Sequence, residues 1–200
     1  MRAVFPMFNE TDDKGHHKQQ DAEECYTQFI SSFQQALRMG KRRDIDGDAE
    51  MIDDTNKDQD TIERLFGIEL ESTVRNMEGD EPEKVIKENV LKLSCHIDNN
   101  NNPINNLSEG LDISLVGDVE KFSEALQRNA IFKKTSKVNK LPSYLCIQFV
   151  RFYWKKESAV GGTKAGKAKI LRSVMYPRIF DLYPFCSDEL KKSLDHGREF

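Results

Sequence analysis

Residues 141–154 read LPSYLCIQFVRFYW, and this stretch decides the fold. Pro142 interrupts any regular structure that precedes it, because proline lacks the backbone N–H that a helix or a central strand needs. From Leu145 to Val150 every residue except Gln148 is apolar, and β-branched and aromatic side chains, which favour strands, are frequent. The pattern predicts the central strand of a sheet, with both faces largely buried.

The aromatic residues that follow mark the exit of this strand. Arg151 comes directly after the most apolar run of the chain, so its charge is expected where the strand leaves the core. Phe152, Tyr153 and Trp154 then place three rings next to one another in the sequence. Packing at a strand end and contact with a bound peptide both explain such rings, and the residues alone do not separate the two.

Length and charge restrict the class of protein. A domain of 200 residues buries roughly 70% of the surface that its unfolded chain exposes, so one sizeable core is expected. The net charge of -4 lacks the basic excess that is typical of nucleic-acid binding. No apolar run approaches the roughly 20 residues that a membrane helix needs, and residues 1–6 are too short for a signal peptide. We expect a soluble intracellular protein without nucleic-acid or membrane partners.

The cysteines predict neither a metal site nor a cofactor. They are widely spaced, and none belongs to a Cys-x-x-Cys pair: Cys25, Cys95, Cys146 and Cys186. Free, reduced and buried thiols are therefore expected. The His16–His17 pair has no third ligand near it, and adjacent side chains point in different directions, so no metal centre is predicted there.

The chain N-terminal to this stretch begins with a helix. Asp21 supplies a carboxylate cap, Glu24 follows three residues later as in a capping box, and apolar residues recur at helical spacing up to Leu37. Gly40 is expected to end the helix. Residues 40–61 are acidic and nearly free of large apolar side chains, which predicts a flexible loop.

Between this loop and the central stretch, apolar runs alternate with polar breaks. Residues 65–74 and 85–97 read as antiparallel strands joined by polar turns. Residues 107–128 read as a short helical passage, and 129–138 as one more strand.

The last part of the chain begins with a segment rich in lysine and glycine. Residues 154–169 predict a mobile, positively charged loop. A strand is expected over residues 170–176, and a final helix over 189–194 with Ser187 or Asp188 as its cap.

Several motifs, in their order along the chain, resemble those of the ubiquitin-specific proteases. The LPxxLxxxxxRF pattern of residues 141–152, the lysine-rich stretch after it and the YPRIFDL sequence of residues 176–182 are similar to the palm of that family. The QQDAEE box of residues 19–24 is similar to the box at the start of a helix in the same family. Short matches also bring the chain closest to its proteasome-associated branch, at residues 65–67, 92–95 and 126–130.

The resemblance implies an α+β fold, a partial papain-like ubiquitin-specific protease fold of which this chain carries a central part. It assigns residues 1–39 to the thumb, 62–128 to the fingers and 129–200 to the palm, with 40–61 as an acidic flexible loop. Residues 154–169 correspond to a mobile loop over the substrate channel, or else to a solvated surface insertion. Many members carry zinc-binding cysteine pairs in the fingers. Asn76 stands near the place of the first pair, which agrees with a zinc-free branch.

The activity implied is thiol-dependent hydrolysis of the bond after the C-terminal glycine of ubiquitin, carried out at the proteasome. The family's nucleophile lies in a Gly-Asn-x-Cys box upstream of the residue 19–24 box, and its base in a Gly-His-Tyr box after Leu182. Neither box occurs here, so we expect no catalytic residue and no activity from this chain alone. Implied partners are ubiquitin, ubiquitinated proteins and the regulatory particle of the 26S proteasome, in the cytoplasm and the nucleus.

The resemblance also implies which residues line the channel for the extended C-terminal tail of ubiquitin: Gln19, Asp21, Glu24, Arg151, Phe152 and Tyr153. Carboxylates suit an arginine-bearing tail, because they form charge-assisted hydrogen bonds with guanidinium and backbone N–H groups. Asp21 has the alternative role of capping its helix, and one carboxylate can do both. For the whole chain, the alternatives are a non-catalytic ubiquitin-binding or scaffolding module and an unrelated interaction protein.

Overall fold

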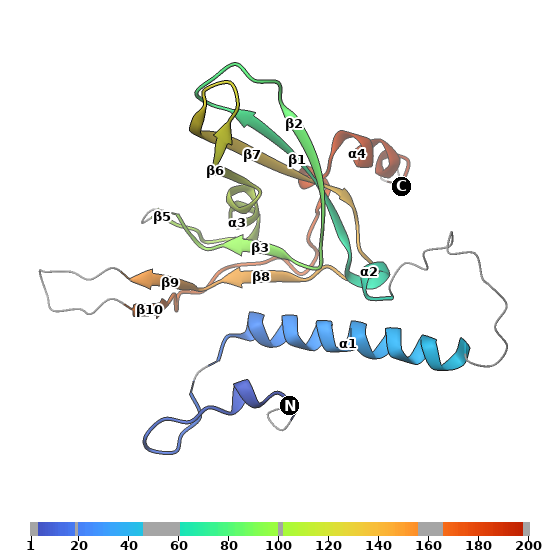
Figure 1. The fold of residues 1–200 in the computed structure, drawn as a ribbon, viewed down its shortest axis with the longest axis vertical. Helices are drawn as coiled ribbons and strands as arrows, with labels where there is room; N and C mark the ends of the chain where they lie inside the picture. The colour runs from blue at the N-terminus through green and yellow to red at the C-terminus, as the bar shows by residue number, and fades with distance from the viewer. Residues whose placement is uncertain (1–3, 19, 46–60, 100–101, 156–165, 198–200) are drawn as a thin grey trace, which may run out of the picture. The chain divides into compact units, whose positions relative to one another are not determined.

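The computed structural model describes residues 4–18, 20–45, 61–99, 102–155 and 166–197 (Figure 1). The chain divides into two compact units, Met1–Leu65 and Phe66–Phe200. In the described part of the chain, no helix is both long enough and apolar enough to cross a membrane. Three parts of the chain lie outside the described residues: residues 46–60 of the expected loop 40–61, residues 156–165 of the expected loop 154–169, and Gln19.

The first unit is built on helix α1, Ala22–Ile45. A short 3-10 helix, η1 (Pro6–Asn9), precedes it, and helix α2 (Thr61–Phe66) follows at the end of the unit. Two corrections apply here. Helix α1 continues past Gly40, because a single glycine costs a helix interior only about 1 kcal/mol. Residues 61–66 also form a helix, whereas residue 61 was expected to belong to a loop and a strand was expected to begin at Leu65.

The second unit contains a four-stranded antiparallel sheet with the order β2-β1-β7-β6 (Figure 1). Its strands are β1 (Ile68–Asn76), β2 (Lys84–Val90), β6 (Val116–Ser123) and β7 (Arg128–Lys140). The predicted antiparallel pairing of the first two apolar runs is confirmed, and so is the strand expected over residues 129–138. Residues 116–123 form a strand instead of continuing the expected helical passage. The expected boundary between fingers and palm, between residues 128 and 129, falls within strand β7 of this sheet.

Residues 141–154 contribute one strand to a separate two-stranded sheet. Strand β8, Ile147–Val150, pairs in parallel with β3, Leu93–His96, and these two strands form a separate sheet. All four residues of β8 are only half-buried, so the prediction of a central strand with two buried faces is wrong. The run 85–97 also breaks in two, because the chain leaves β2 after Val90 and starts β3 at Leu93 in a different sheet.

Helix α3, Leu107–Ser114, packs against β3 at unusually close range. Asn106 caps the helix by accepting a hydrogen bond from the Glu109 N–H at 3.0 Å. Gly110 permits the close approach, since a Cβ there would lie 2.3 Å from the Cys95 Sγ and 2.7 Å from the His96 carbonyl oxygen. This contact joins the helix to the strand beside β8.

The C-terminal part of the unit returns to strand β7, where Cys186 forms a bridge with Val138. Strands β9 (Phe152–Lys155) and β10 (Gly166–Lys169) form an antiparallel pair, and β4 (Asp98–Asn99) pairs with β5 (Asn102–Pro103). The strand expected over residues 170–176 is wrong: the segment is irregular, apart from a bridge between Asn106 and Met175. A short 3-10 helix, η2 (Tyr183–Phe185), leads to α4 (Asp188–Asp195).

The cap predicted for the last helix is confirmed for Ser187. Its Oγ accepts a hydrogen bond from the Leu190 N–H at 3.2 Å, and it donates to the Asn139 side-chain oxygen at 2.6 Å. The Ser187 N–H also bonds the Val138 carbonyl at 2.8 Å. Helix α4 is therefore held directly on β7.

The core of the second unit draws on strands, helix α3 and the C-terminal segment together. Its buried members come from sequence positions more than 100 residues apart: Ile68, Leu70, Leu93, Cys95, Ile97, Leu107, Leu111, Leu115, Val138, Val174, Phe185 and Cys186. Burial of this apolar surface, at roughly 25 cal/mol per Å², is the main force that holds the sheet against α3.

Candidate functional site

Asp21 lies at the start of α1, where the capping role left open by the sequence is observed. Its carboxylate accepts a hydrogen bond from the Glu23 N–H at 3.0 Å, and its backbone carbonyl accepts one from Cys25 at 3.1 Å. The side chain of Asp21 is half-buried and that of Glu24 is exposed. Two carboxylates thus stand together at the positive end of a helix, where negative charge is stabilised.

Arg151 lies between β8 and β9, and its guanidinium is turned onto its own chain. Its Nη1 donates to the carbonyl oxygens of Arg172 at 2.8 Å and of Ile170 at 3.3 Å. The guanidinium carbon is 5.7 Å from the centre of the Phe149 ring. Arg151 therefore anchors the segment that returns after the β9–β10 pair, and it is half-buried.

Arg172 shows a feature that sequence reasoning did not predict. Its side-chain Nε and Nη2 atoms are buried and have no hydrogen-bond acceptor among the residues that the structure describes. Buried guanidinium N–H groups normally bond a carboxylate or a carbonyl. Arg172, whose carbonyl oxygen is bonded to Arg151, thus carries two buried N–H donor groups that an acceptor outside the described residues would satisfy.

Phe152 and Tyr153 continue directly from Arg151 into β9. Phe152 is half-buried and has the Lys169 ammonium 5.7 Å from its ring centre, whereas Tyr153 is 45% exposed and Trp154 is 69% exposed. Opposite faces of the strand carry Tyr153 and Trp154, so the β9–β10 pair presents rings on both sides.

More apolar surface follows in the segment after β10, and sequence reasoning did not identify it. Four side chains there are at least 69% exposed: Leu171, Met175, Tyr176 and Ile179. The Tyr176 ring lies 6.4 Å from that of Phe149, which connects this surface to β8. This exposed surface was not predicted, because a strand over residues 170–176 would have turned alternate side chains inward, whereas the observed segment is irregular.

The six predicted tail-channel residues therefore fall into two groups. Arg151, Phe152 and Tyr153 are consecutive in the second unit, while Asp21 and Glu24 share the start of α1 in the first. Gln19 lies outside the described residues.

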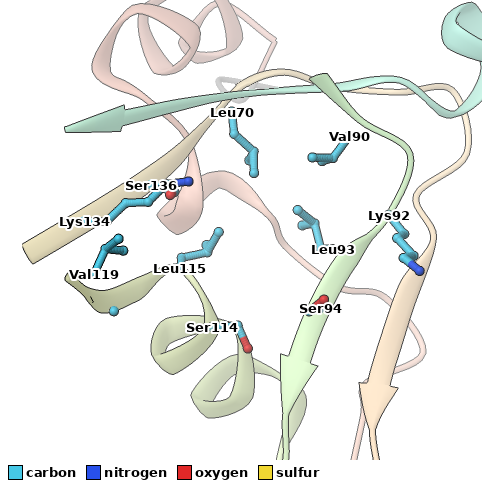
Figure 2. Close-up of a pocket in the computed structure, with 11 residues that line it drawn as sticks. Leu70, Val90, Lys92, Leu93, Ser94, Ser114, Leu115, Val119, Lys134 and Ser136 are labelled. Atoms are coloured by element: carbon cyan, nitrogen blue, oxygen red, sulfur yellow. The ribbon is translucent and has the colours of Figure 1, made fainter. Parts of the chain in front are cut away.

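A pocket of about 250 Å³ lies within the second unit, between the four-stranded sheet and the β3–α3 pair (Figure 2). Figure 2 shows Leu70, Val90, Leu93 and Leu115 turned toward a common space. The remaining lining residues are Lys92, Ser94, Ser114, Gly117, Val119, Lys134 and Ser136. The Lys134 ammonium is 2.6 Å from the Glu88 carboxylate, and the Ser72 and Ser136 hydroxyls are 2.9 Å apart. Because residues from six elements form this pocket, no local motif predicts it.

The four cysteines are free, as predicted, but only two of them are buried. Burial raises the pKa of the Cys95 thiol to about 11, and it also raises the pKa of Cys186. Both thiols point at backbone carbonyls, of Leu107 and Leu182 respectively. Cys25 and Cys146 are half-buried, so the prediction of burial is wrong for them. Among the described residues, no three His, Cys, Asp or Glu side chains gather as a metal site would require.

Comparisons with known proteins relate this chain to one family. A model of the family described as "Ubiquitin carboxyl-terminal hydrolase" matches residues 2–199. Ubiquitin carboxyl-terminal hydrolase 6 of Arabidopsis thaliana is 38% identical over 199 residues, which are 100% of this chain and 36% of that protein. Ubiquitin carboxyl-terminal hydrolase 14 of Caenorhabditis elegans is 29% identical over 95% of this chain and 32% of its own length. The chain thus spans about a third of these relatives.

A solved structure agrees at the level of the fold. A chain in the structure of the SAGA Ubp8/Sgf11/Sus1/Sgf73 DUB module bound to ubiquitin aldehyde superposes with a TM-score of 0.56. The match covers 86% of this chain and 34% of that chain, with 22% sequence identity. At this identity the likeness shows the fold alone, and the predicted α+β fold, part of a ubiquitin-specific protease fold, is confirmed.

Proposed function

Because the chain belongs to the ubiquitin carboxyl-terminal hydrolase family, we propose that it is the ubiquitin-holding part of a thiol-dependent deubiquitinase. The complete enzyme cleaves the bond after the C-terminal glycine of ubiquitin, acts on ubiquitinated proteins at the proteasome, and works in the cytoplasm and nucleus. The observation that carries the proposal is the family match over residues 2–199. The proteasome assignment is supported by the likeness to hydrolases 6 and 14.

Within this function, the chain binds and orients the tail of ubiquitin and performs no chemistry by itself. A cysteine nucleophile needs a low thiol pKa, usually provided by a helix N-terminus and a neighbouring histidine. Cys95 and Cys186 have raised pKa values in buried sites, and Cys25 lies one turn inside α1. The same observation supports the second candidate, a non-catalytic ubiquitin-binding or scaffolding module.

The tail-binding residues that we propose belong to both units, with carboxylates in the first and aromatic rings in the second. Tyr153 offers a half-exposed ring for the extended tail, beside Phe152, and Arg151 holds this wall in place through its bonds to the returning segment. Asp21 and Glu24, with Gln19, supply acceptors for the arginines and backbone N–H groups of the tail. In this assignment the Asp21 carboxylate both caps α1 and binds the ligand.

The variant Asp21→Asn/Glu24→Gln separates the two roles of Asp21. Asparagine caps helices as well as aspartate does, so α1 is retained while both charges are lost. We expect the affinity for ubiquitin to fall about tenfold, as the loss of about 1.5 kcal/mol from charge-assisted hydrogen bonds implies. Fluorescence polarisation with labelled ubiquitin measures this.

The matched control is Asp13→Asn/Glu63→Gln, which removes two exposed carboxylates of the same unit. Ubiquitin that lacks its C-terminal tail should bind the parent chain and Asp21→Asn/Glu24→Gln equally weakly. If the charge-neutral variant binds intact ubiquitin as tightly as the parent does, the tail assignment of these carboxylates is wrong.

A further inference from the structure

In the four-stranded sheet of the second unit, the residues of the outer strand β6 are almost all exposed. Among the residues that the structure describes, strand β6 pairs only with β7, so it is an edge of the four-stranded sheet (Figure 1). Every residue from Val116 to Phe122 is exposed, and only Ser123 is buried. An edge strand presents a row of unpaired backbone N–H and C=O groups, to which another extended chain can add.

The side chains of β6 carry opposite charges on its two faces. Residues that alternate along a strand share a face, so Asp118 and Glu120 lie on one face and Lys121 on the other. Val116 and Phe122, which are 40% and 54% exposed, flank the two carboxylates on the same face. A strand added beside β6 therefore meets two adjacent carboxylates between two apolar side chains.

A second copy of this chain is a poor occupant of this edge. Two copies of β6 paired antiparallel about a two-fold axis place residues of the same face opposite each other. Centring the pair on Val119 sets Asp118 against Glu120, and centring it on Glu120 sets that carboxylate against itself. Like charges directly opposite each other destabilise a strand pair, so β6 favours a strand of another sequence over a second copy of itself.

The pocket of Figure 2 adds a contact on the other face. Gly117 and Val119 contribute the β6 wall of this pocket. A Cβ built on Gly117 would have no heavy atom within 4 Å, so the space beside this position is open. A residue that an added strand places opposite Gly117 lies on the same face as the pocket, and an apolar side chain suits the leucine-lined space.

We infer that β6 is a docking edge for an extended basic segment of a partner protein, which adds as a further strand with basic residues opposite Asp118 and Glu120 and an apolar residue opposite Gly117. This interaction is separate from recognition of the ubiquitin tail. It requires no change in the fold, because the edge is already exposed.

A designed peptide tests the inference. Paired antiparallel to residues 116–123, the octapeptide Thr-Val-Glu-Lys-Val-Lys-Leu-Thr places its lysines opposite Glu120 and Asp118, its glutamate opposite Lys121 and its leucine opposite Gly117. We expect saturable binding by fluorescence polarisation, and slowed amide hydrogen exchange in β6 but not in the other edge strand, β2. The same peptide N-methylated at alternate residues cannot form the strand ladder and should not bind.

Charge reversal provides the specificity test. Asp118→Lys/Glu120→Lys should weaken binding of the octapeptide about tenfold, because two favourable cross-strand pairs become repulsive. The variant should instead prefer the peptide Thr-Val-Glu-Glu-Val-Glu-Leu-Thr, in which glutamates replace the two lysines and the glutamate opposite Lys121 is kept. The control Asp80→Lys/Asp98→Lys makes the same change of net charge at exposed positions outside β6. Equal binding of the N-methylated peptide, protection of β2 instead of β6, or no exchange of preference would each overturn the inference.

Discussion

At the scale of single residues, a polar cluster closes the turns at the far end of the four-stranded sheet. Asn76 donates to the Ser123 hydroxyl at 3.3 Å, and Ser123 donates to the Glu81 carboxylate. Asn76 also accepts hydrogen bonds from the N–H groups of Glu78 and Gly79 at 2.9 and 3.1 Å. Asn76 and Ser123 are buried, so hydrogen bonds hold this end of the sheet together.

This cluster predicts a pH dependence for Glu81. The hydrogen bond from Ser123 is the main reason that the pKa of Glu81 lies below its ordinary value of 4.5. Because the carboxylate is favoured in the folded state, its contribution is present at neutral pH and is lost as the pH falls through the folded pKa. Glu81→Gln should therefore lower the urea midpoint at pH 7, and the two midpoints should converge near pH 3.

The control for this experiment is Glu124→Gln, a change of the same kind in the exposed turn between β6 and β7. It should leave the midpoint at pH 7 unchanged. An equal loss of stability in Glu81→Gln at pH 7 and pH 3 would show that the ionised form of Glu81 contributes nothing.

At the scale of elements, the contact of α3 with β3 depends on Gly110. A Cβ at this position would come within 2.3 Å of the Cys95 Sγ and 2.7 Å of a backbone carbonyl oxygen, and neither the strand nor the buried thiol can move away easily. We expect Gly110→Ala to lower the free energy of unfolding by about 1 to 3 kcal/mol, the usual cost of overpacking.

Urea denaturation followed by circular dichroism measures this loss, with Gly117→Ala as the control. A Cβ at Gly117 meets no atom within 4 Å, so that variant should be as stable as the parent. Equal stability of Gly110→Ala and the parent would mean that α3 does not pack on β3 at this distance.

Elements with a strong local pattern were predictable, and those decided by distant partners were not. Apolar spacing located α1 and β7, and serine before an acidic turn located the cap of α4. The stretch from Leu145 to Val150 was correctly predicted as a strand but wrongly as a central one, because pairing with β3 depends on contacts about 50 residues away. The division of residues 85–97 between two sheets has no local signal either.

In the candidate site, too, features with a local sequence pattern were predictable and those formed by distant residues were not. Asp21 could be assigned a cap from its position before an apolar helical pattern, and the bond to Glu23 is present. The anchoring of Arg151 on Ile170 and Arg172 could not be predicted, since it joins residues about 20 positions apart across the β9–β10 pair. The pocket beside β6 could not be predicted either, because five strands and helix α3 contribute its lining.

At the scale of the whole molecule, the chain forms two compact units and spans about a third of the length of the relatives it matches. Its core in the second unit is continuous from β1 to Cys186, which supports a stable platform for binding. Two of its four thiols, Cys95 and Cys186, are buried. Our central proposal is that the chain binds ubiquitin without cleaving it.

The most direct test treats the chain with ubiquitin that carries a thiol-reactive C-terminus, and follows intact mass beside turnover of a fluorogenic ubiquitin. We predict reversible binding, no covalent adduct on any of the four cysteines and no turnover. Burial raises the pKa of the Cys95 and Cys186 thiols, and neither the Gly-Asn-x-Cys box nor the Gly-His-Tyr box of the family occurs in this sequence. A single adduct on one cysteine, accompanied by turnover that is lost when that cysteine is changed to serine, would contradict the account.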